Sequence, residues 1–246
     1  MRNAEFNDPR LVQVYDAQCP WSNDDDLFLS LANEVPGSRV LDLGCGTGRL
    51  TVALAGAGHT VTGVDPARAS LTAAQVKPSA EKVSWIEGTA ADAPASAFDL
   101  ALMTSHVAQF MVDDAEWDAT LVDLRRSLVP GGRLIFDSRD PRARGWEKWN
   151  PVDSRARVTL PGGTDVDLWT EVTELKGENV TFVHHYIFSD TSEELLSRAT
   201  LRFRTEETLR SSLEASGFEV EHIFGGWHRE PAGQGDGEFI VVARAK

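Results

Sequence analysis

Three glycines at alternate positions carry the clearest chemistry in this sequence. Gly44, Gly46 and Gly48 follow a short apolar run, and a helical pattern begins directly after them. Residues without a side chain let the backbone approach a ligand closely, and the first turn of a helix offers free N–H groups. Asp65 ends the next apolar run, where its carboxylate could accept hydrogen bonds from both hydroxyls of a ribose. Together these four residues predict a nucleotide-binding site.

The spacing of the glycines limits which nucleotide could bind. The dinucleotide fingerprint G-x-G-x-x-G needs a glycine at position 49, where this chain has Arg49. A phosphate-binding P-loop is excluded because no Gly-Lys-Ser or Gly-Lys-Thr follows the glycines. An NAD-dependent oxidoreductase is therefore only a distant alternative.

Strand and helix patterns alternate after the glycines. Strands separated by helices form a parallel sheet with helices on both faces. The expected fold class is therefore α/β, with a Rossmann-like doubly wound sheet. Two amphipathic helices come first and a turn at Pro130–Gly132 precedes the fifth strand. The strands are expected at 39–43, 60–64, 83–86, 98–103 and 133–136, and the helices at 9–18, 24–34, 50–57, 67–77 and 113–128.

Long extended runs interrupt this alternation and predict an antiparallel β-meander inserted into the α/β domain. His184 and His185 are adjacent in the middle run, so their side chains point to opposite faces and cannot bind one metal ion together. At most one of them can face the acceptor pocket, and we expect both to face solvent or to pack within the sheet. The extended runs cover 165–175, 180–188 and 195–203, and a helix at 205–215 and strands at 218–224 and 238–243 follow them.

Five ordered segments make this chain similar to the class I S-adenosylmethionine-dependent methyltransferases. The stretch from Val40 to Gly48 resembles the family's first motif, and the resemblance covers about residues 36–137. It implies S-adenosyl-L-methionine as the cofactor and a seven-stranded sheet whose last strand is antiparallel. The other similar segments are 61–65 at the second strand, 87–92 near the adenine, 98–102 in the fourth strand and 128–134 before the fifth.

The resemblance also implies a division of the chain into three parts. Residues 36–144 and 205–246 would form the cofactor-binding core, in which the last helix and two strands close the sheet. Residues 1–35 would form a helical lid. Residues 145–204 would form an inserted sheet that covers the site of the methyl acceptor.

Cofactor contacts follow from the same resemblance. The three glycines would lie beneath the methionine and ribose, Asp42 would address the methionine amino group through water, and Asp65 would bind the ribose hydroxyls. Asp92 or the backbone around Ala90 would contact the adenine, because Thr89 stands where many relatives have an acid. The full predicted cofactor set is Asp42, Gly44, Cys45, Gly46, Thr47, Gly48, Asp65, Pro66, Ala90, Asp92 and Thr104.

The family places the methyl acceptor beyond the ends of the fourth and fifth strands. His106 is the candidate general base there, because histidine is the commonest acid–base residue, and a pocket wall or a helix cap is the alternative. Arg139 and Trp146 belong to an aromatic and basic cluster that could bind an anionic or aromatic acceptor, or whose tryptophans could anchor the inserted sheet. Tyr15 and Trp21 are expected either to contact the ligands from the lid or to pack between helices. The predicted substrate residues are Tyr15, Trp21, Gln109, Arg139 and Trp146.

The composition restricts the partners. With 24 Lys and Arg against 38 Asp and Glu, the formal net charge is −14, which disfavours nucleic acid and anionic membrane surfaces. The sequence shows no signal-peptide pattern and no apolar window long enough for a membrane span, so we expect a cytoplasmic protein. Cys19 and Cys45 are expected to be reduced thiols, and no metal site is expected.

The leading interpretation is an enzyme that transfers a methyl group from S-adenosyl-L-methionine to a nitrogen or oxygen atom of a small molecule. The tetrapeptide Asn-Pro-Pro-Tyr, the family's signature for methylating the amino groups of adenine or glutamine, is absent after the fourth strand. RNA methylation stays open because Arg139, Arg142 and Arg144 could form a local basic patch. A regulator that binds the cofactor without turnover is the alternative from another class.

Overall fold

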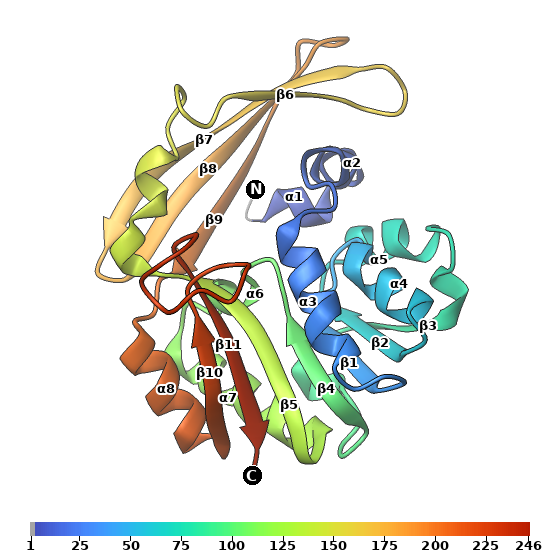
Figure 1. The fold of residues 1–246 in the computed structure, drawn as a ribbon. Helices are drawn as coiled ribbons and strands as arrows, with labels where there is room; N and C mark the ends of the chain where they lie inside the picture. The colour runs from blue at the N-terminus through green and yellow to red at the C-terminus, as the bar shows by residue number, and fades with distance from the viewer. Residues whose placement is uncertain (1–2) are drawn as a thin grey trace.

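A seven-stranded sheet is the centre of the computed structural model, which describes residues 3–246 (Figure 1). Strand β11 is antiparallel to both of its neighbours, and the remaining neighbouring strands are parallel. The predicted α/β fold class, with a mostly parallel sheet and an antiparallel last strand, is confirmed. The strands in spatial order are β10 (Phe218–Phe224), β11 (Glu238–Ala245), β5 (Leu128–Arg139), β4 (Phe98–Met103), β1 (Arg39–Leu43), β2 (Thr60–Asp65) and β3 (Val83–Glu87).

Both faces of this sheet are buried, which explains why its strands are nearly continuous apolar runs. Within β1, Val40 belongs to the buried cluster on one face, whereas Leu41 and Leu43 belong to the cluster on the other face. Five helices surround the sheet. The first cluster includes side chains of α3 (Asn23–Asn33) and α4 (Arg49–Gly56), the second includes side chains of α7 (Asp114–Ser127) and α8 (Glu206–Ala215), and α5 (Arg68–Gln75) contacts β2 and β3.

A second, antiparallel sheet lies between β5 and α8 in the chain, as the meander prediction requires. In Figure 1 this yellow-to-orange sheet leans over the N-terminal helices, above the seven-stranded sheet. Side chains of its strands share a buried cluster with Leu11 and Val14 of the second helix. Its strands are β6 (Ala156–Thr159), β7 (Asp165–Lys176), β8 (Asn179–Phe188) and β9 (Glu194–Arg202), and the N-terminal helices are α1 (Ala4–Asn7) and α2 (Pro9–Gln18).

Three differences from the expected elements have local causes. Strand β6 is not expected from the sequence, because its four residues are mostly exposed and show no alternation. Strand β5 begins at Leu128, which pairs with Phe98 before the register shifts, so the expected turn at Pro130–Gly132 lies within the strand as an irregularity. Helices α1 and α6 (Val107–Phe110) are single turns, too short for a periodic pattern to show.

Among residues 3–246, no helix combines the length and the apolar character that a bilayer span requires.

Candidate active site

The glycine loop after β1 packs tightly at one glycine and is open at another. Gly44, Gly46 and Gly48 all have positive φ angles, of 73°, 53° and 75°, a region that side chains rarely tolerate. A Cβ atom at Gly44 would lie 2.5 Å from a methyl carbon of Val107, whereas a Cβ at Gly46 would meet no atom within 4 Å. The loop is therefore held against α6 on one side and leaves open space above Gly46.

Two carboxylates lie on the strands that flank this loop. Asp65, at the end of β2, accepts hydrogen bonds from the backbone N–H of Gly46 at 2.8 Å and of Ala67 at 2.7 Å. Asp42, in β1, accepts one from the Thr51 hydroxyl at 2.6 Å, and its other carboxylate oxygen is buried without a partner among residues 3–246. Burial raises the pKa of both groups, that of Asp42 to about 6. An unpartnered buried acceptor beside an open loop is the environment that a ligand donor or a bridging water would complete.

The remaining predicted cofactor residues differ in what they contact. The Thr47 hydroxyl donates to Asp16, which ties the loop to α2, and burial raises the pKa of the Cys45 thiol. Asp92 accepts the Thr89 N–H at 2.8 Å and so holds the turn after β3. Pro66 is exposed, Thr104 is half-buried at the end of β4, and the Ala90 carbonyl accepts a hydrogen bond from Arg126. Contact of these residues with the cofactor stays a prediction.

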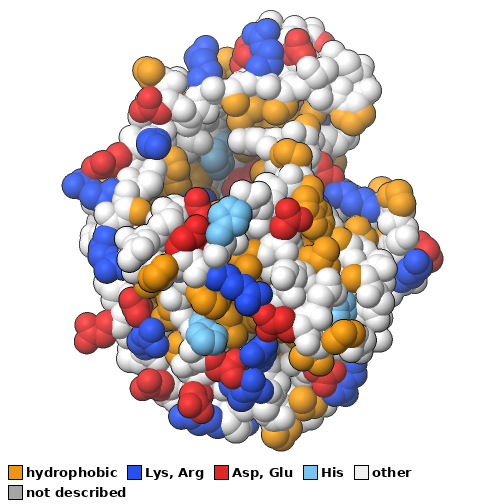
Figure 2. All heavy atoms as spheres, viewed as in Figure 1, with side chains coloured by type: hydrophobic (Ala, Val, Ile, Leu, Met, Phe, Trp, Pro, Cys, Tyr) orange, Lys and Arg blue, Asp and Glu red, His pale blue; other side chains and the backbone are white. Residues whose placement is uncertain are grey.

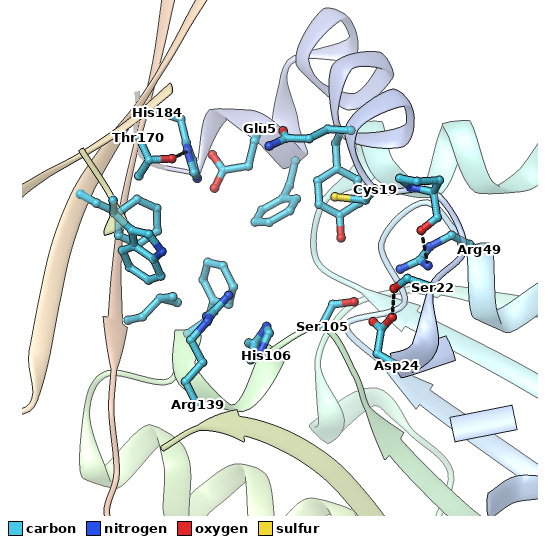
Figure 3. Close-up of a pocket in the computed structure, with 18 of the residues that line it drawn as sticks. Glu5, Cys19, Ser22, Asp24, Arg49, Ser105, His106, Arg139, Thr170 and His184 are labelled. Carbon is cyan, nitrogen blue, oxygen red and sulfur yellow. Dashed lines mark hydrogen bonds between the residues drawn. The ribbon is translucent and has the colours of Figure 1, made fainter. Parts of the chain in front are cut away.

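A cavity of about 500 Å³ extends from the start of α4 to the antiparallel sheet. Figure 2 shows the hollow on this face, between the second sheet and the rest of the molecule. One end is formed by the α2–α3 connection and by Arg49, and the other end by one face of the antiparallel sheet (Figure 3). The lining residues are Glu5, Phe6, Tyr15, Gln18, Cys19, Pro20, Ser22, Asp24, Arg49, Ser105, His106, Phe110, Arg139, Trp149, Thr170, Phe182, His184, Tyr186 and Leu201.

His106 forms part of the cavity wall and also precedes α6 with a positive φ of 65°. Its Nε2 lies 3.1 Å from a Glu238 oxygen and 3.2 Å from an Asp137 oxygen, and its backbone N–H donates to Asp137 at 2.9 Å. Burial lowers the pKa of His106 to about 4 and raises the pKa of Asp137 to about 6 and of Glu238 to about 7. Because Nε2 faces carboxylate oxygens, Nδ1 is the ring nitrogen left to accept a proton.

Of the predicted substrate residues, the structure brings Tyr15 and Arg139 to the cavity. Trp21 is 41% exposed and does not line it, and Trp146 packs edge-on against the ring of Phe203, the residue that follows β9. Gln109 is fully buried and accepts a hydrogen bond from Arg139 at 3.0 Å, so it holds that guanidinium from behind the cavity wall.

Sequence reasoning missed two cavity residues that could do chemistry. Glu5, on α1, is only 4% exposed; one of its carboxylate oxygens is buried without a partner among residues 3–246, and burial raises its pKa to about 7. His184 lines the cavity with its Nδ1 2.7 Å from the Thr170 hydroxyl, and burial lowers its pKa to about 4. Figure 3 shows both side chains at the sheet end of the cavity.

The expectation that His184 faces solvent or only packs within the sheet is therefore wrong. The two histidines do point to opposite faces, as predicted: His185 lies against Glu194 at 2.8 Å and stacks on Trp169. The alternation of Phe182, His184 and Tyr186 was the signal that could have placed His184 on an apolar inner face. Glu5 had no comparable signal, because a single turn of helix has no periodicity.

Comparisons with known proteins show the family to which this chain belongs. The model of a methyltransferase domain family matches residues 40–132. The cypemycin N-terminal methyltransferase of a Streptomyces species is 31% identical over 221 residues, which are 87% of this chain and 86% of that protein. This chain belongs to the class I S-adenosylmethionine-dependent methyltransferases.

Solved structures show that this methyltransferase shares its fold with enzymes of low sequence identity. The sugar N-methyltransferase KedS8 from a Streptoalloteichus species has a TM-score of 0.75 and 20% identity, over 96% of this chain and 92% of that chain. The amino pentose methyltransferase CalS10 from Micromonospora echinaspora, solved with S-adenosylmethionine bound, has a TM-score of 0.70 and 21% identity, over 95% of each chain.

The cofactor of this methyltransferase is S-adenosylmethionine, and the residues around the glycine loop fit it. The open space at Gly46 leaves room for the cofactor. The Asp65 carboxylate would accept hydrogen bonds from the ribose hydroxyls, and the unpartnered oxygen of Asp42 would accept one from the amino group or from a bridging water. When bound, the cofactor supplies a methyl group activated by a positively charged sulfur. The protein must then hold an acceptor in line with that methyl group and keep it unprotonated.

Proposed function

We propose that this methyltransferase methylates an amine nitrogen of a small molecule. The observation that carries the proposal is Glu5, a buried carboxylate in the cavity that makes no ion pair with any Lys, Arg or His of residues 3–246. A buried carboxylate without a partner is costly, and an ammonium group or an amine N–H would compensate it. A hydroxyl acceptor would offer only one weaker donor.

The walls around Glu5 also suit an amine. Tyr15, Phe110, Trp149 and Phe182 line the cavity, and aromatic ring faces attract cations. An amine becomes positively charged as it takes up a methyl group, so these rings would stabilise the charge that develops. The acceptor's carbon skeleton would pack against the same apolar surface.

Two groups in the cavity could take the proton that an ammonium must lose before it attacks. Glu5, with a pKa of about 7, is partly ionised at neutral pH and can accept a proton. His184, with a pKa of about 4, is neutral there and has an unprotonated ring nitrogen. The nitrogen lone pair is then free to form the new bond to the methyl carbon while the proton stays on the protein or passes to water.

Three relatives or neighbours have names that specify nitrogen or an amino substrate, and one of them covers 87% of this chain. One relative, a ubiquinone biosynthesis O-methyltransferase, is named for oxygen but matches only 45% of this chain, so the names favour nitrogen without being uniform. An RNA acceptor is less well supported. Arg139 lies inside the cavity, whereas Arg142 pairs with Asp140 at 2.7 Å and Arg144 pairs with Glu147 at 2.8 Å. These arginines do not form the free basic patch that RNA binding would need.

The proposal can be tested with a library of small molecules that contains amines and alcohols of the same carbon skeleton. The full chain is incubated with S-adenosylmethionine, and each product is identified by its mass and its fragments. We expect methylated amines and unchanged alcohols, and we expect Glu5→Gln to lower kcat/KM for the best amine by about 10- to 100-fold. Glu219→Gln is the matched control, because Glu219 is an exposed carboxylate that does not line the cavity, and this variant should keep the wild-type rate. Methylation of the alcohols, or of no amine, would contradict the proposal.

A further inference from the structure

We infer that the acceptor amine also carries an anionic group and that Arg139 binds this group; the inference rests on the proposed amine methylation. Arg139 ends β5, and its side chain reaches into the cavity from the core (Figure 3). Glu5, of the opposite charge, lies on the opposite wall of the cavity (Figure 3). The acceptor would then be a zwitterion at neutral pH, of the class of amino carboxylates or amino phosphates.

The Arg139 guanidinium has no ion pair within the part of the chain that the structure describes. Its Nη1 donates to Gln109 at 3.0 Å, and its carbon lies 5.2 Å from the centre of the Trp149 ring. Asp137 and Glu238 attract it only over a longer distance, and both carboxylates already face His106. The Nε and Nη2 donors are therefore left for another acceptor.

Other arginines near the site show two environments. Arg49 pairs with Asp25, and Arg202 pairs with Asp114 at 2.6 Å and with Glu178 at 3.2 Å. Arg204, which is fully buried, has no ion pair among residues 3–246 and donates instead to two backbone carbonyls. Arg139 differs from both, because it lines the cavity and its guanidinium donates to the Gln109 side chain alone among these residues, so a ligand anion would complete its hydrogen bonds.

The site that holds Arg139 is built rather than accidental. Gln109 is completely buried and is fixed by its own hydrogen bond to the Arg202 carbonyl at 3.1 Å, so it orients the guanidinium. Trp149 supports the flat face of the group. A guanidinium held in a plane presents paired N–H donors that match a carboxylate or a phosphate.

Glu5 and Arg139 line the same cavity without pairing with each other. Glu5 is buried and Arg139 is half-buried, so each charge alone is unfavourable. A ligand with an ammonium at one end and an anion at the other would neutralise both at once. An amine without an anionic group would compensate only Glu5, through its ammonium, so its affinity should be lower.

The test compares pairs of probes that differ only in the anion. The pairs are the ω-amino carboxylates of two to six carbons with their amides, and O-phosphoethanolamine with ethanolamine. Binding to the full chain saturated with S-adenosylhomocysteine is measured by isothermal titration. We expect at least one zwitterion to bind 10-fold or more tightly than its partner without the anion, and the preferred pair tells a carboxylate site from a phosphate site.

Substitutions assign the preference to Arg139. Arg139→Gln should reduce the ratio of affinities to below 2, Arg139→Lys should retain part of it, and Arg142→Gln, which changes an exposed arginine outside the cavity, should leave it unchanged. Equal binding within every pair, or no binding by any probe, overturns the inference. A 10-fold loss of S-adenosylhomocysteine affinity in Arg139→Gln also overturns it, because Arg139 would then serve the cofactor.

The same probes separate this inference from the proposed function. Methylation of amines without any preference for zwitterions would leave amine methylation standing and remove the role of Arg139. Preferential binding of zwitterions that are methylated on oxygen would leave the anion site standing and remove the amine assignment. The two failures therefore give different products and different affinity ratios.

Discussion

At the glycine loop the Asp65 carboxylate is held by two backbone N–H groups, whereas at the antiparallel sheet the Glu5 carboxylate has an oxygen with no partner among residues 3–246. Both side chains are buried, and burial raises the pKa of both. The first carboxylate is oriented before any ligand arrives. The second is left incomplete, as is Arg139 across the cavity. The backbone thus orients Asp65 beside the glycine loop, where one Asp42 oxygen is left for a ligand or a water, whereas at the proposed acceptor end Glu5 and Arg139 both lack an ion-pair partner among residues 3–246.

The two ends also differ in where their residues come from. Most of the predicted cofactor residues lie on one strand, its loop and the end of the next strand, between Asp42 and Pro66, and Ala90, Asp92 and Thr104 lie farther along the chain. The proposed acceptor end would combine Glu5 of α1, Arg139 of β5 and His184 of β8, which line one cavity but are far apart in the chain. A local site depends on a short segment folding correctly, whereas a non-local site depends on how two sheets and a helix pack. Substitutions at the two ends should therefore have different consequences.

The largest effect is expected at the cofactor end, from Asp65→Ala. This change removes the acceptors predicted for the ribose hydroxyls and leaves the N–H groups of Gly46 and Ala67 without their partner. Hydrogen bonds to a charged group contribute about 1.5–3 kcal/mol each, so affinity for S-adenosylhomocysteine should fall about 100-fold. Isothermal titration measures it, with circular dichroism to show that the fold is retained. An affinity within threefold of wild type would refute the ribose assignment and remove the contrast between the two ends.

The same contrast explains how much the sequence could predict. The glycine loop and Asp65 were predicted because glycine spacing and strand ends are visible in one continuous segment. The fold class followed from alternating strands and helices, and the second sheet from its extended runs. Glu5 could not be found, because its single turn of helix has no pattern and its burial depends on packing against β9 and α5. Trp21 and Trp146 were considered for the acceptor from their places in the lid segment and after the fifth strand, with packing as the alternative; neither lines the cavity, because the sequence pattern does not show how loops pack.

A smaller effect, on stability, should distinguish the acceptor end. Burial raises the pKa of Glu5 from an ordinary value of 4.5 to about 7 in the folded protein. Between pH 4.5 and pH 7 the Glu5 carboxyl is therefore protonated in the folded protein but ionised in the unfolded chain. Wild type should therefore lose stability relative to Glu5→Gln as the pH rises from 4.5 through 7. At pH 8 the variant should be more stable by about 2 kcal/mol, and at pH 4 the difference should vanish.

Urea unfolding of both proteins at pH 4 and pH 8, without ligands, measures this difference. Glu219→Gln serves as the control, because an exposed carboxylate should give no pH-dependent difference. If Glu5→Gln is instead less stable than wild type at pH 8, the carboxylate has a stabilising partner and the acceptor end is not incomplete.

The smallest effect is expected from Asp92, a predicted cofactor residue that is exposed, whereas Asp65 is buried. Asp92 is exposed, and its carboxylate accepts the Thr89 N–H while the Thr89 hydroxyl also lies within 3.3 Å. A cap of this kind contributes about 1 kcal/mol, so Asp92→Ala should weaken S-adenosylhomocysteine binding only about fivefold, by loosening the turn that carries Ala90. Asp92→Asn keeps an acceptor for the Thr89 N–H and should restore most of the affinity. If Asp92→Asn binds S-adenosylhomocysteine as weakly as Asp92→Ala does, and the loss of affinity approaches that of Asp65→Ala, the Asp92 carboxylate contacts the adenine through its charge. The cofactor end would then depend on side-chain contacts to its ligand as much as the proposed acceptor end does.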